Sequence, residues 1–199
     1  MNYLAHIFLA RQSDAAMIGA MLGDFAKASV DGLYTPEIER EIMLHRYIDS
    51  YTDSHPLVKA SLQLFEGPRR RYGGIVLDVF YDYLLTQRWD LYSDMPRREL
   101  IAQFHRALRD HMDILPDKLR AIAPRIIEQD WLASYEELAG VEMAVTRISQ
   151  RLSRNGHLMR EGLADVRANY ADIAGGFEQF FPDLMQFTAR RRAQLSAAQ

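Results

Sequence analysis

The chain has 199 residues, of which 48% are hydrophobic and 26% are charged, as in an ordinary soluble globular protein. This composition excludes intrinsic disorder, collagen-like repeats and a membrane-embedded body. Cysteine is absent, which excludes disulfides, thiolate zinc sites and cysteine nucleophiles. The formal net charge of −3 argues against a nucleic-acid-binding surface along the whole chain. A phosphate or an acidic partner must therefore meet a local basic patch.

The length predicts a single domain over residues 1–199. The N-terminal segment has no basic flank, and His6 interrupts its apolar run, whereas a signal peptide has a basic region followed by a longer apolar core. The strongly apolar run Ala15–Leu22 is far shorter than the ~20 residues that span a bilayer. We therefore expect a cytoplasmic protein that does not insert into a membrane.

Apolar residues recur at three- and four-residue steps nearly throughout the chain, which is typical of amphipathic helices. Strand-like alternation between hairpin turns is missing. Thr35, Pro36 and Glu37 form the pattern of an N-cap followed by a proline and an acid in the first helical turn. We predict an all-α fold, a compact multi-helix bundle whose tail frays from about residue 188. The expected helices cover residues 2–11, 14–28, 36–53, 56–66, 69–89, 96–114, 117–131, 134–153, 157–174 and 176–195.

Two carboxylates, Asp78 and Asp82, lie four residues apart in an almost wholly apolar segment. This spacing places both on one face of a central helix, ~6 Å apart at Cβ. A like-charged pair on a buried helix is unfavourable unless a cation compensates it. A bound metal ion and an internal salt bridge both meet this need, and the pattern alone leaves both open.

A second motif places His45 and Asp49 four residues apart on one helix face, with Asp53 one turn later. An imidazole and a carboxylate on adjacent turns can hold one divalent ion. The alternative is a hydrogen bond between the two side chains that orients a structural histidine. The motif by itself favours the structural alternative.

Two more polar residues occur in apolar surroundings. Asp24 follows an apolar helix, where the helix dipole is unfavourable for an acid, so either a metal ion or an ion pair with Lys27 or Arg46 is expected to compensate it. His6 lies in the apolar N-terminal segment, and a lone histidine in such surroundings is more often a core residue than a ligand.

These motifs together supply a set of imidazoles and carboxylates that helices of one bundle can bring together. Histidine and aspartate without cysteine suit a hydrolytic Mn²⁺, Mg²⁺, iron or zinc site better than structural zinc. The chain has no P-loop and no G-x-S-x-G nucleophile elbow. We therefore place a metal site in residues 1–95 or so and further helices in residues 96–195. The candidate residues are His6, Asp24, His45, Asp49, Asp78 and Asp82.

Arginines gather at the starts of two expected helices. Cations at a helix N-terminus oppose its dipole, which indicates a role beyond stability, although a charge run is usually a solvated face. We predict that they form a docking surface for an acidic partner or a phosphate-bearing substrate. These residues are Arg69, Arg70, Arg71, Arg97 and Arg98.

Four motifs in the first ninety residues, Met1–Ala10, Gly23–Lys27, His45–Asp53 and Leu77–Leu85, resemble the acyl carrier protein phosphodiesterase (holo-ACP hydrolase) family. This family is similar to HD-domain metal-dependent phosphohydrolases, so the resemblance implies an HD-domain-like helical bundle. The implied activity is removal of 4′-phosphopantetheine from holo-acyl carrier protein to give apo-protein, with Mn²⁺ as the usual metal ion.

The resemblance also implies roles for individual residues. The chain departs from the family at Tyr83, where histidine is frequent. The matching polar positions are Asp24, His45, Asp78 and Asp82, followed by His6 and Asp49.

The expected reaction is attack of an activated water on phosphorus. Asp49 or Asp53 is expected to orient that water or transfer a proton, and Arg46 to contact a non-bridging phosphate oxygen. Two other functions stay open: an HD-like hydrolase of a nucleotide or another phosphodiester, and a non-catalytic interaction protein. In the latter case the acids would pair with Arg46, Arg88 and Lys27.

Overall fold

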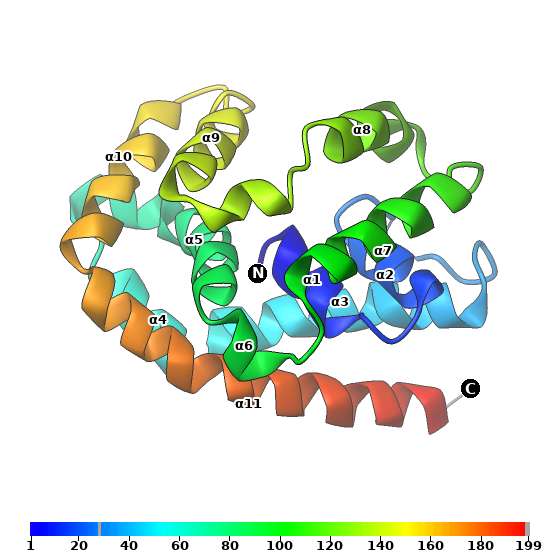
Figure 1. Cartoon of the computed structure of the whole chain (residues 1–199). Helices are drawn as coiled ribbons and strands as arrows, with labels where there is room; N and C mark the ends of the chain where they lie inside the picture. The colour runs from blue at the N-terminus through cyan, green and yellow to red at the C-terminus, as the bar shows by residue number, and fades with distance from the viewer. Residues whose placement is uncertain (28, 198–199) are drawn as a thin grey trace. The chain divides into compact units, whose positions relative to one another are not determined.

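The computed structural model describes residues 1–27 and 29–197, and all regular structure in these ranges is helical (Figure 1). The described residues form eleven α-helices and two 3-10 helices, with no strand among them. The all-α prediction is confirmed. None of the described helices has the length and the apolar character needed to cross a membrane.

The helices follow one another closely along the chain. Their bounds are α1 (Tyr3–Leu9), α2 (Asp14–Leu22), α3 (Pro36–Ser54), α4 (Pro56–Gln63), η1 (Gly67–Tyr72), α5 (Gly73–Gln87), α6 (Trp89–Tyr92), α7 (Arg97–Asp110), α8 (Asp117–Glu128), η2 (Ala133–Glu136), α9 (Leu138–Ser149), α10 (Gly156–Ala168) and α11 (Tyr170–Ala197). The expected segment 14–28 ends early, at the close of α2, and its last position lies outside the described residues.

The boundary between the last two helices differs from the sequence prediction. Helix α10 ends at Ala168 rather than at 174, because Asn169 leaves the helical conformation and caps it. The carbonyl oxygen of Asp165 accepts the backbone N–H of Asn169 (3.0 Å), and the Asn169 side-chain amide donates a second hydrogen bond to it (2.9 Å). Helix α11 then continues through Gly175, the position at which the expected segments 157–174 and 176–195 are divided.

The chain is divided into two compact units, each assembled from several segments. Unit 1 comprises Met1–Asn2, Ser50–Tyr92 and Ser134–Leu184. Unit 2 comprises Tyr3–Asp49, Ser93–Ala133 and the segment from Met185 onward. The organisation of residues 1–199 as a single domain stays a prediction.

Unit 1 is built around α5, which packs against α9, α10 and η1. Because α5 is apolar on nearly all sides, it buries residues on several faces, including Val76, Leu77 and Val79. Two aromatic residues of α11, Phe177 and Phe180, are also fully buried in this unit. Their burial removes apolar area from water and thereby stabilises this unit.

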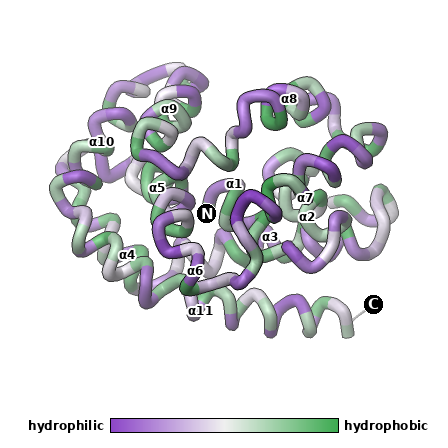
Figure 2. The backbone as a smooth tube through the Cα atoms, in the orientation of Figure 1, coloured by the Kyte–Doolittle hydropathy of each residue, from purple (hydrophilic) through white to green (hydrophobic). Residues whose placement is uncertain are grey.

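Unit 2 packs α1 against α2, and α2 against α7. Helices α1 and α2 bury nearly every residue, among them Leu4, Phe8 and Met17. Helix α11, in contrast, alternates hydrophilic and hydrophobic residues along its length, as Figure 2 shows by colour. Among the site residues described below, His6 lies on α1, a short helix whose residues are nearly all buried.

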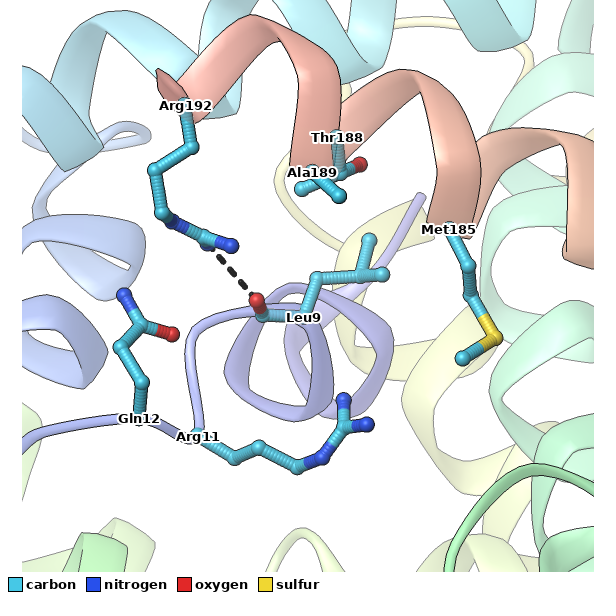
Figure 3. A pocket seen from close by; sticks show the side chains of 7 residues that line it. All are labelled: Leu9, Arg11, Gln12, Met185, Thr188, Ala189 and Arg192. Atoms are coloured by element: carbon cyan, nitrogen blue, oxygen red, sulfur yellow. Dashed lines mark hydrogen bonds between the residues drawn. The ribbon is translucent and has the colours of Figure 1, made fainter. Parts of the chain in front are cut away.

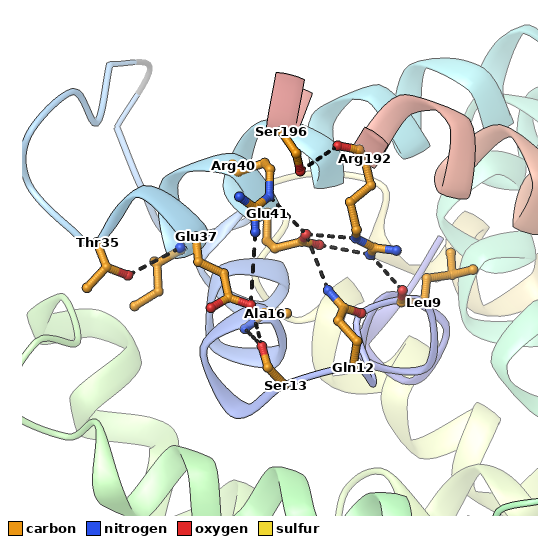
Figure 4. A network of polar contacts seen from close by, with 11 residues as sticks. Leu9, Gln12, Ser13, Ala16, Thr35, Glu37, Arg40, Glu41, Arg192 and Ser196 are labelled. Carbon is orange, nitrogen blue, oxygen red and sulfur yellow. Dashed lines mark hydrogen bonds and ion pairs between the residues drawn. The ribbon is translucent and has the colours of Figure 1, made fainter. Parts of the chain in front are cut away.

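Helix α3 begins with the predicted cap, because the Ile38 amide donates to Thr35 Oγ1 (3.4 Å). One turn later, Glu41 is buried and accepts two hydrogen bonds from the Arg192 guanidinium of α11, at 2.8 and 2.9 Å (Figure 4). The same guanidinium donates to the carbonyl oxygen of Leu9 at the end of α1 (2.7 Å). Within unit 2 this network ties the end of α11 to α1 and α3. The tail that the sequence predicts to fray is helical as far as Ala197.

Candidate metal centre

Unit 2 brings together four of the predicted site residues: His6, Asp24, His45 and Asp49. His6 lies on α1, His45 and Asp49 lie one turn apart on α3, and Asp24 follows the end of α2. The two imidazoles are buried, whereas the Asp24 and Asp49 side chains are 48% and 39% exposed. The cluster therefore meets solvent through its carboxylates.

His45 is fixed by the backbone of α2 and faces two acids. Its Nδ1–H donates to the carbonyl oxygen of Ala20 (2.7 Å), because a carbonyl can only accept. Its Nε2 lies 3.4 Å from Asp24 Oδ1 and 3.2 Å from Asp49 Oδ2. Metal-binding histidines share this arrangement, in which a carbonyl holds one ring nitrogen and leaves the other for the ion.

Gly23 makes room for the His45 ring. A Cβ atom at position 23 would lie 2.1 Å from His45 Cγ and 2.5 Å from His45 Nδ1, which is inside any allowed contact. The backbone φ of Gly23 is −50°, so the requirement at this position is for space and not for an unusual conformation. Gly23 was not among the site residues predicted from the sequence. Its place directly before Asp24, in a motif already singled out, was the available signal.

His6 contributes the second imidazole. Its Nε2–H donates to Asp49 Oδ1 (3.0 Å), and its ring stacks on the His45 ring with centroids 3.7 Å apart. Its Nδ1 is buried and has no hydrogen-bond partner. A proton on that nitrogen would be unsatisfied, so the surroundings keep His6 in the neutral form that metal ions bind.

The charges of the cluster are strongly coupled. Burial opposes a charge on His45, but hydrogen bonds to Asp24 and Asp49 outweigh it and raise the pKa of His45 to about 9. Burial and the neighbouring His45 lower the pKa of His6 to about 4. Burial also opposes the ionised carboxylates, yet hydrogen bonds from the histidines hold the pKa of Asp24 and of Asp49 below the ordinary value. The site thus stabilises a cation beside two carboxylates.

These observations fit a divalent metal ion. His6, His45 and Asp49 each offer one ligand atom, and these atoms lie within 4.8 Å of one another. Two imidazole nitrogens and a carboxylate oxygen are a common ligand set for divalent ions in hydrolytic sites. The Asp24 carboxylate lies beside His45 and adds a fourth ligand atom to these three. The donor set, the fixed His45 ring and the neutral His6 together make a possible metal-binding site.

Asp78 and Asp82 belong to unit 1 and lie on α5. The Asp78 carboxylate is 3.0 Å from the amino-terminal nitrogen of Met1, an ion pair of the kind that the sequence left open. Asp82 is fully buried on the same helix. The metal-ligand roles expected for these two aspartates stay predictions.

Arg46 and Asp53 lie on α3, on either side of Asp49 along the chain. The Arg46 guanidinium donates to the carbonyl oxygen of Lys27 (2.6 Å), which anchors the segment that follows Asp24. Asp53 is exposed one turn beyond Asp49. The catalytic roles expected for Arg46, Asp49 and Asp53 stay predictions.

The predicted docking arginines differ in how far the fold uses them. Arg69 donates two hydrogen bonds of 2.7 Å to the buried carboxylate of Asp165. Arg70 donates to two backbone carbonyls of its own unit. Arg71 of unit 1 and Arg98 of unit 2 are exposed. The fold thus gives Arg69 a structural role that the sequence did not indicate, and the docking surface, Arg97 included, stays a prediction.

Comparison with known proteins identifies the family. A family model described as acyl carrier protein phosphodiesterase matches residues 1–184. Proteins named acyl carrier protein phosphodiesterase are similar over nearly their whole length. The one from Photorhabdus laumondii is 32% identical over 189 residues, which is 94% of each chain. The one from Yersinia enterocolitica is 32% identical over 204 residues, covering 100% of this chain and 98% of the relative. The one from Escherichia coli O157:H7 is 31% identical over 199 residues, covering 96% and 99%.

No solved structure matches the chain, so the relation to HD-domain hydrolases stays a prediction. The matched region contains all four clustered residues, His6, Asp24, His45 and Asp49. The chain belongs to the acyl carrier protein phosphodiesterase family.

Proposed function

We propose that this chain is a metal-dependent phosphodiesterase that removes 4′-phosphopantetheine from holo-acyl carrier protein and returns the apo-protein. Membership of the family over residues 1–184 supports the substrate and the reaction. The position of His45 Nε2, 3.4 Å from Asp24 and 3.2 Å from Asp49, is the observation that most directly supports metal dependence.

In this proposal His6, His45 and Asp49 hold the ion, and Asp24 completes the ligand set. We propose Mn²⁺ as the resident ion, with Mg²⁺ or Fe²⁺ as alternatives, because a mixed nitrogen and oxygen donor set accepts all three. When bound, a divalent ion screens the charge of a phosphodiester and lowers the pKa of a water molecule. Asp78 and Asp82 remain proposed ligands from the family resemblance.

The chain's own residues have separate tasks. Against its burial, hydrogen bonds from His45 and His6 hold the pKa of Asp49 below its ordinary value. The Asp49 carboxylate is therefore a weak base, which orients a water better than it accepts a proton. Asp53, exposed one turn later, is the proposed proton acceptor. Arg46 is the proposed donor to a non-bridging phosphate oxygen. The exposed carboxylate side of the cluster is the side from which the substrate would approach.

Recognition of the acyl carrier protein is proposed to use basic side chains, since carrier proteins of this kind are small and acidic. The exposed Arg71 and Arg98 are the best placed of the predicted set, because Arg69 and Arg70 are engaged in hydrogen bonds within their own unit. The cytoplasmic location expected from the sequence stays a prediction.

The direct test is to incubate the purified chain with holo-acyl carrier protein and Mn²⁺ and to follow the intact mass of the carrier. Loss of the phosphopantetheine mass with Mn²⁺, and no loss with a chelator, is the expected result. A nucleotide panel assayed in parallel separates the proposal from a nucleotide phosphohydrolase. Carrier protein that stays intact with every divalent ion would refute the proposal.

A further inference from the structure

Unit 2 contains a cavity of about 450 Å³ beside the end of α1. This volume falls within the usual range for small-molecule sites. The cavity is formed by the end of α1, the residues that follow it and one stretch of α11, and it includes no residue of the candidate metal centre. Its lining residues, shown in Figure 3, are Leu9, Arg11, Gln12, Met185, Thr188, Ala189 and Arg192.

The two arginines of the cavity differ in how their charges are balanced. Arg192 forms two hydrogen bonds with the carboxylate of buried Glu41 and a third with the Leu9 carbonyl oxygen. Its positive charge is therefore neutralised within the protein. Arg11 donates to the Phe8 carbonyl oxygen (2.8 Å) and lies over the Phe8 ring, 4.2 Å from its centroid. Among the described residues, Arg11 forms no ion pair with an acid.

An uncompensated guanidinium in a half-buried position is unfavourable, and an anion would relieve it. Burial lowers the pKa of Arg11 below its ordinary value, and the nearby Arg192 lowers it further. Since Glu41 already neutralises Arg192, the cavity has one positive charge in excess. That excess matches a ligand with a single negative charge. The second charge of a dianion would have no cation to balance it, and the Glu41 carboxylate would repel it.

The remaining lining residues indicate the body of the ligand. Leu9, Met185 and Ala189 supply apolar surface, whereas Gln12 adds a single side-chain amide. In Figure 3 the Arg11 and Met185 side chains extend toward one another. A ligand whose charged group lies at Arg11 would thus have the apolar Met185 side chain beside the rest of the molecule. Sites of this kind bind molecules that combine one polar head with a hydrocarbon part.

We propose that this cavity binds a small aliphatic monocarboxylate, with the Arg11 guanidinium as its anion-binding group. The planar guanidinium matches a carboxylate through two parallel N–H···O bonds. The hydrocarbon part would lie against Leu9 and Met185. This binding site is separate from the proposed phosphodiesterase function, so either proposal can fail without the other.

Calorimetric titration of the full chain with hexanoate tests the proposal. Saturable binding is expected, with hexanol and inorganic phosphate both binding more weakly, because the first lacks the charge and the second lacks the hydrocarbon part. Arg11→Gln should weaken hexanoate binding by about tenfold or more, and Arg11→Lys should weaken it less. Arg106→Gln, an exposed arginine of α7 in the same unit, is the matched control and should leave the Kd unchanged.

A second measurement locates the ligand. With ¹³C-methyl-labelled methionine, hexanoate should shift the NMR signal of Met185, which a Met185→Leu variant identifies. The same spectra show whether the Arg11 variants remain folded. Absence of saturable hexanoate binding, tighter binding of phosphate than of hexanoate, an unchanged Kd in a folded Arg11→Gln variant, or an unmoved Met185 signal would each overturn the proposal.

Discussion

The imidazole rings of His6 and His45 stack face to face, with centroids 3.7 Å apart and planes 12° from parallel. Two imidazolium ions at this distance would repel each other, so a proton on one ring disfavours a proton on the other. The hydrogen bonds of His45 to Asp24 and Asp49 decide which ring keeps its proton. In the metal-free cluster the two rings therefore differ in charge: His45 carries the proton, and His6 stays neutral.

The stacked pair predicts how the stability of the metal-free protein depends on pH. Against its burial, ion pairing raises the pKa of His45 from 6.5 to about 9, so folding retains a proton that the unfolded chain releases. This proton contributes up to about 3 kcal/mol to the free energy of unfolding. The contribution is complete below pH 6.5 and is lost as the pH rises through 9. Burial lowers the pKa of His6 to about 4, so its contribution is lost as the pH falls from 6.5 through 4.

Urea unfolding with a chelator present, at intervals from pH 4 to pH 9.5, measures both effects. The free energy of unfolding attributable to His45 is the difference between the wild-type chain and His45→Ala, and it should shrink steadily on the alkaline side. A difference that grows between pH 6.5 and pH 9 would contradict the assigned charge states.

Gly23→Ala should displace the His45 ring, because the new methyl group would lie 2.1 Å from His45 Cγ. We expect a loss of about 1–3 kcal/mol in stability from overpacking. Affinity for Mn²⁺ should fall by about tenfold or more, since the ring orientation of a ligand is disturbed. Gly175→Ala is the matched control: a Cβ there meets nothing within 4 Å, and the helical position should gain about 0.5–1 kcal/mol. Equal metal affinities for the two variants would show that Gly23 does not position His45.

Arg192→Ala should destabilise the fold strongly. The substitution leaves the buried Glu41 carboxylate without its main partner, which costs about 3 kcal/mol. Arg190→Ala, an exposed neighbour on α11, should change the free energy of unfolding by less than about 0.5 kcal/mol. Chemical unfolding compares them directly. If both variants were equally stable, the helical end of α11 would not anchor the unit.

Arg71→Glu and Arg98→Glu should each raise the KM for holo-acyl carrier protein about three- to tenfold while kcat stays unchanged, because charge at a docking surface acts mainly on association. The wild-type KM should also rise with salt. Arg154→Glu, another exposed arginine, is the control. Arg69→Ala should instead lower the Tm, since Asp165 then loses its partner. A KM insensitive both to salt and to these reversals would exclude the docking role.

The helices were predictable because their residues follow local rules. The cap at Thr35 and the apolar spacing along α5 act within a few residues of sequence, and both appear in the structure. The end of α10 was not predictable in the same way. The expected segments divide at position 175, whereas the chain leaves the helical conformation at Asn169.

The candidate site was predictable only as a set of residue types. The four-residue spacing places His45 and Asp49 on one helix face, and in α3 His45 Nε2 lies 3.2 Å from Asp49 Oδ2. The approach of His6 depends on the packing of α1, which no local pattern specifies. The same holds for Arg192, which lies 151 positions from Glu41 along the chain. Contacts of this range are set by tertiary structure, and single-sequence patterns do not report them.

Metal binding by the His6, His45 and Asp49 cluster can be tested by titrating the wild-type chain and His45→Ala with Mn²⁺, followed by calorimetry at a pH near 7.5. His157→Ala removes an exposed histidine of α10 and serves as the control. We predict saturable Mn²⁺ binding by the wild-type and the control, and loss of about 100-fold or more in affinity, together with phosphodiesterase activity, in His45→Ala. Unchanged Mn²⁺ affinity and unchanged turnover in a folded His45→Ala variant would contradict the account.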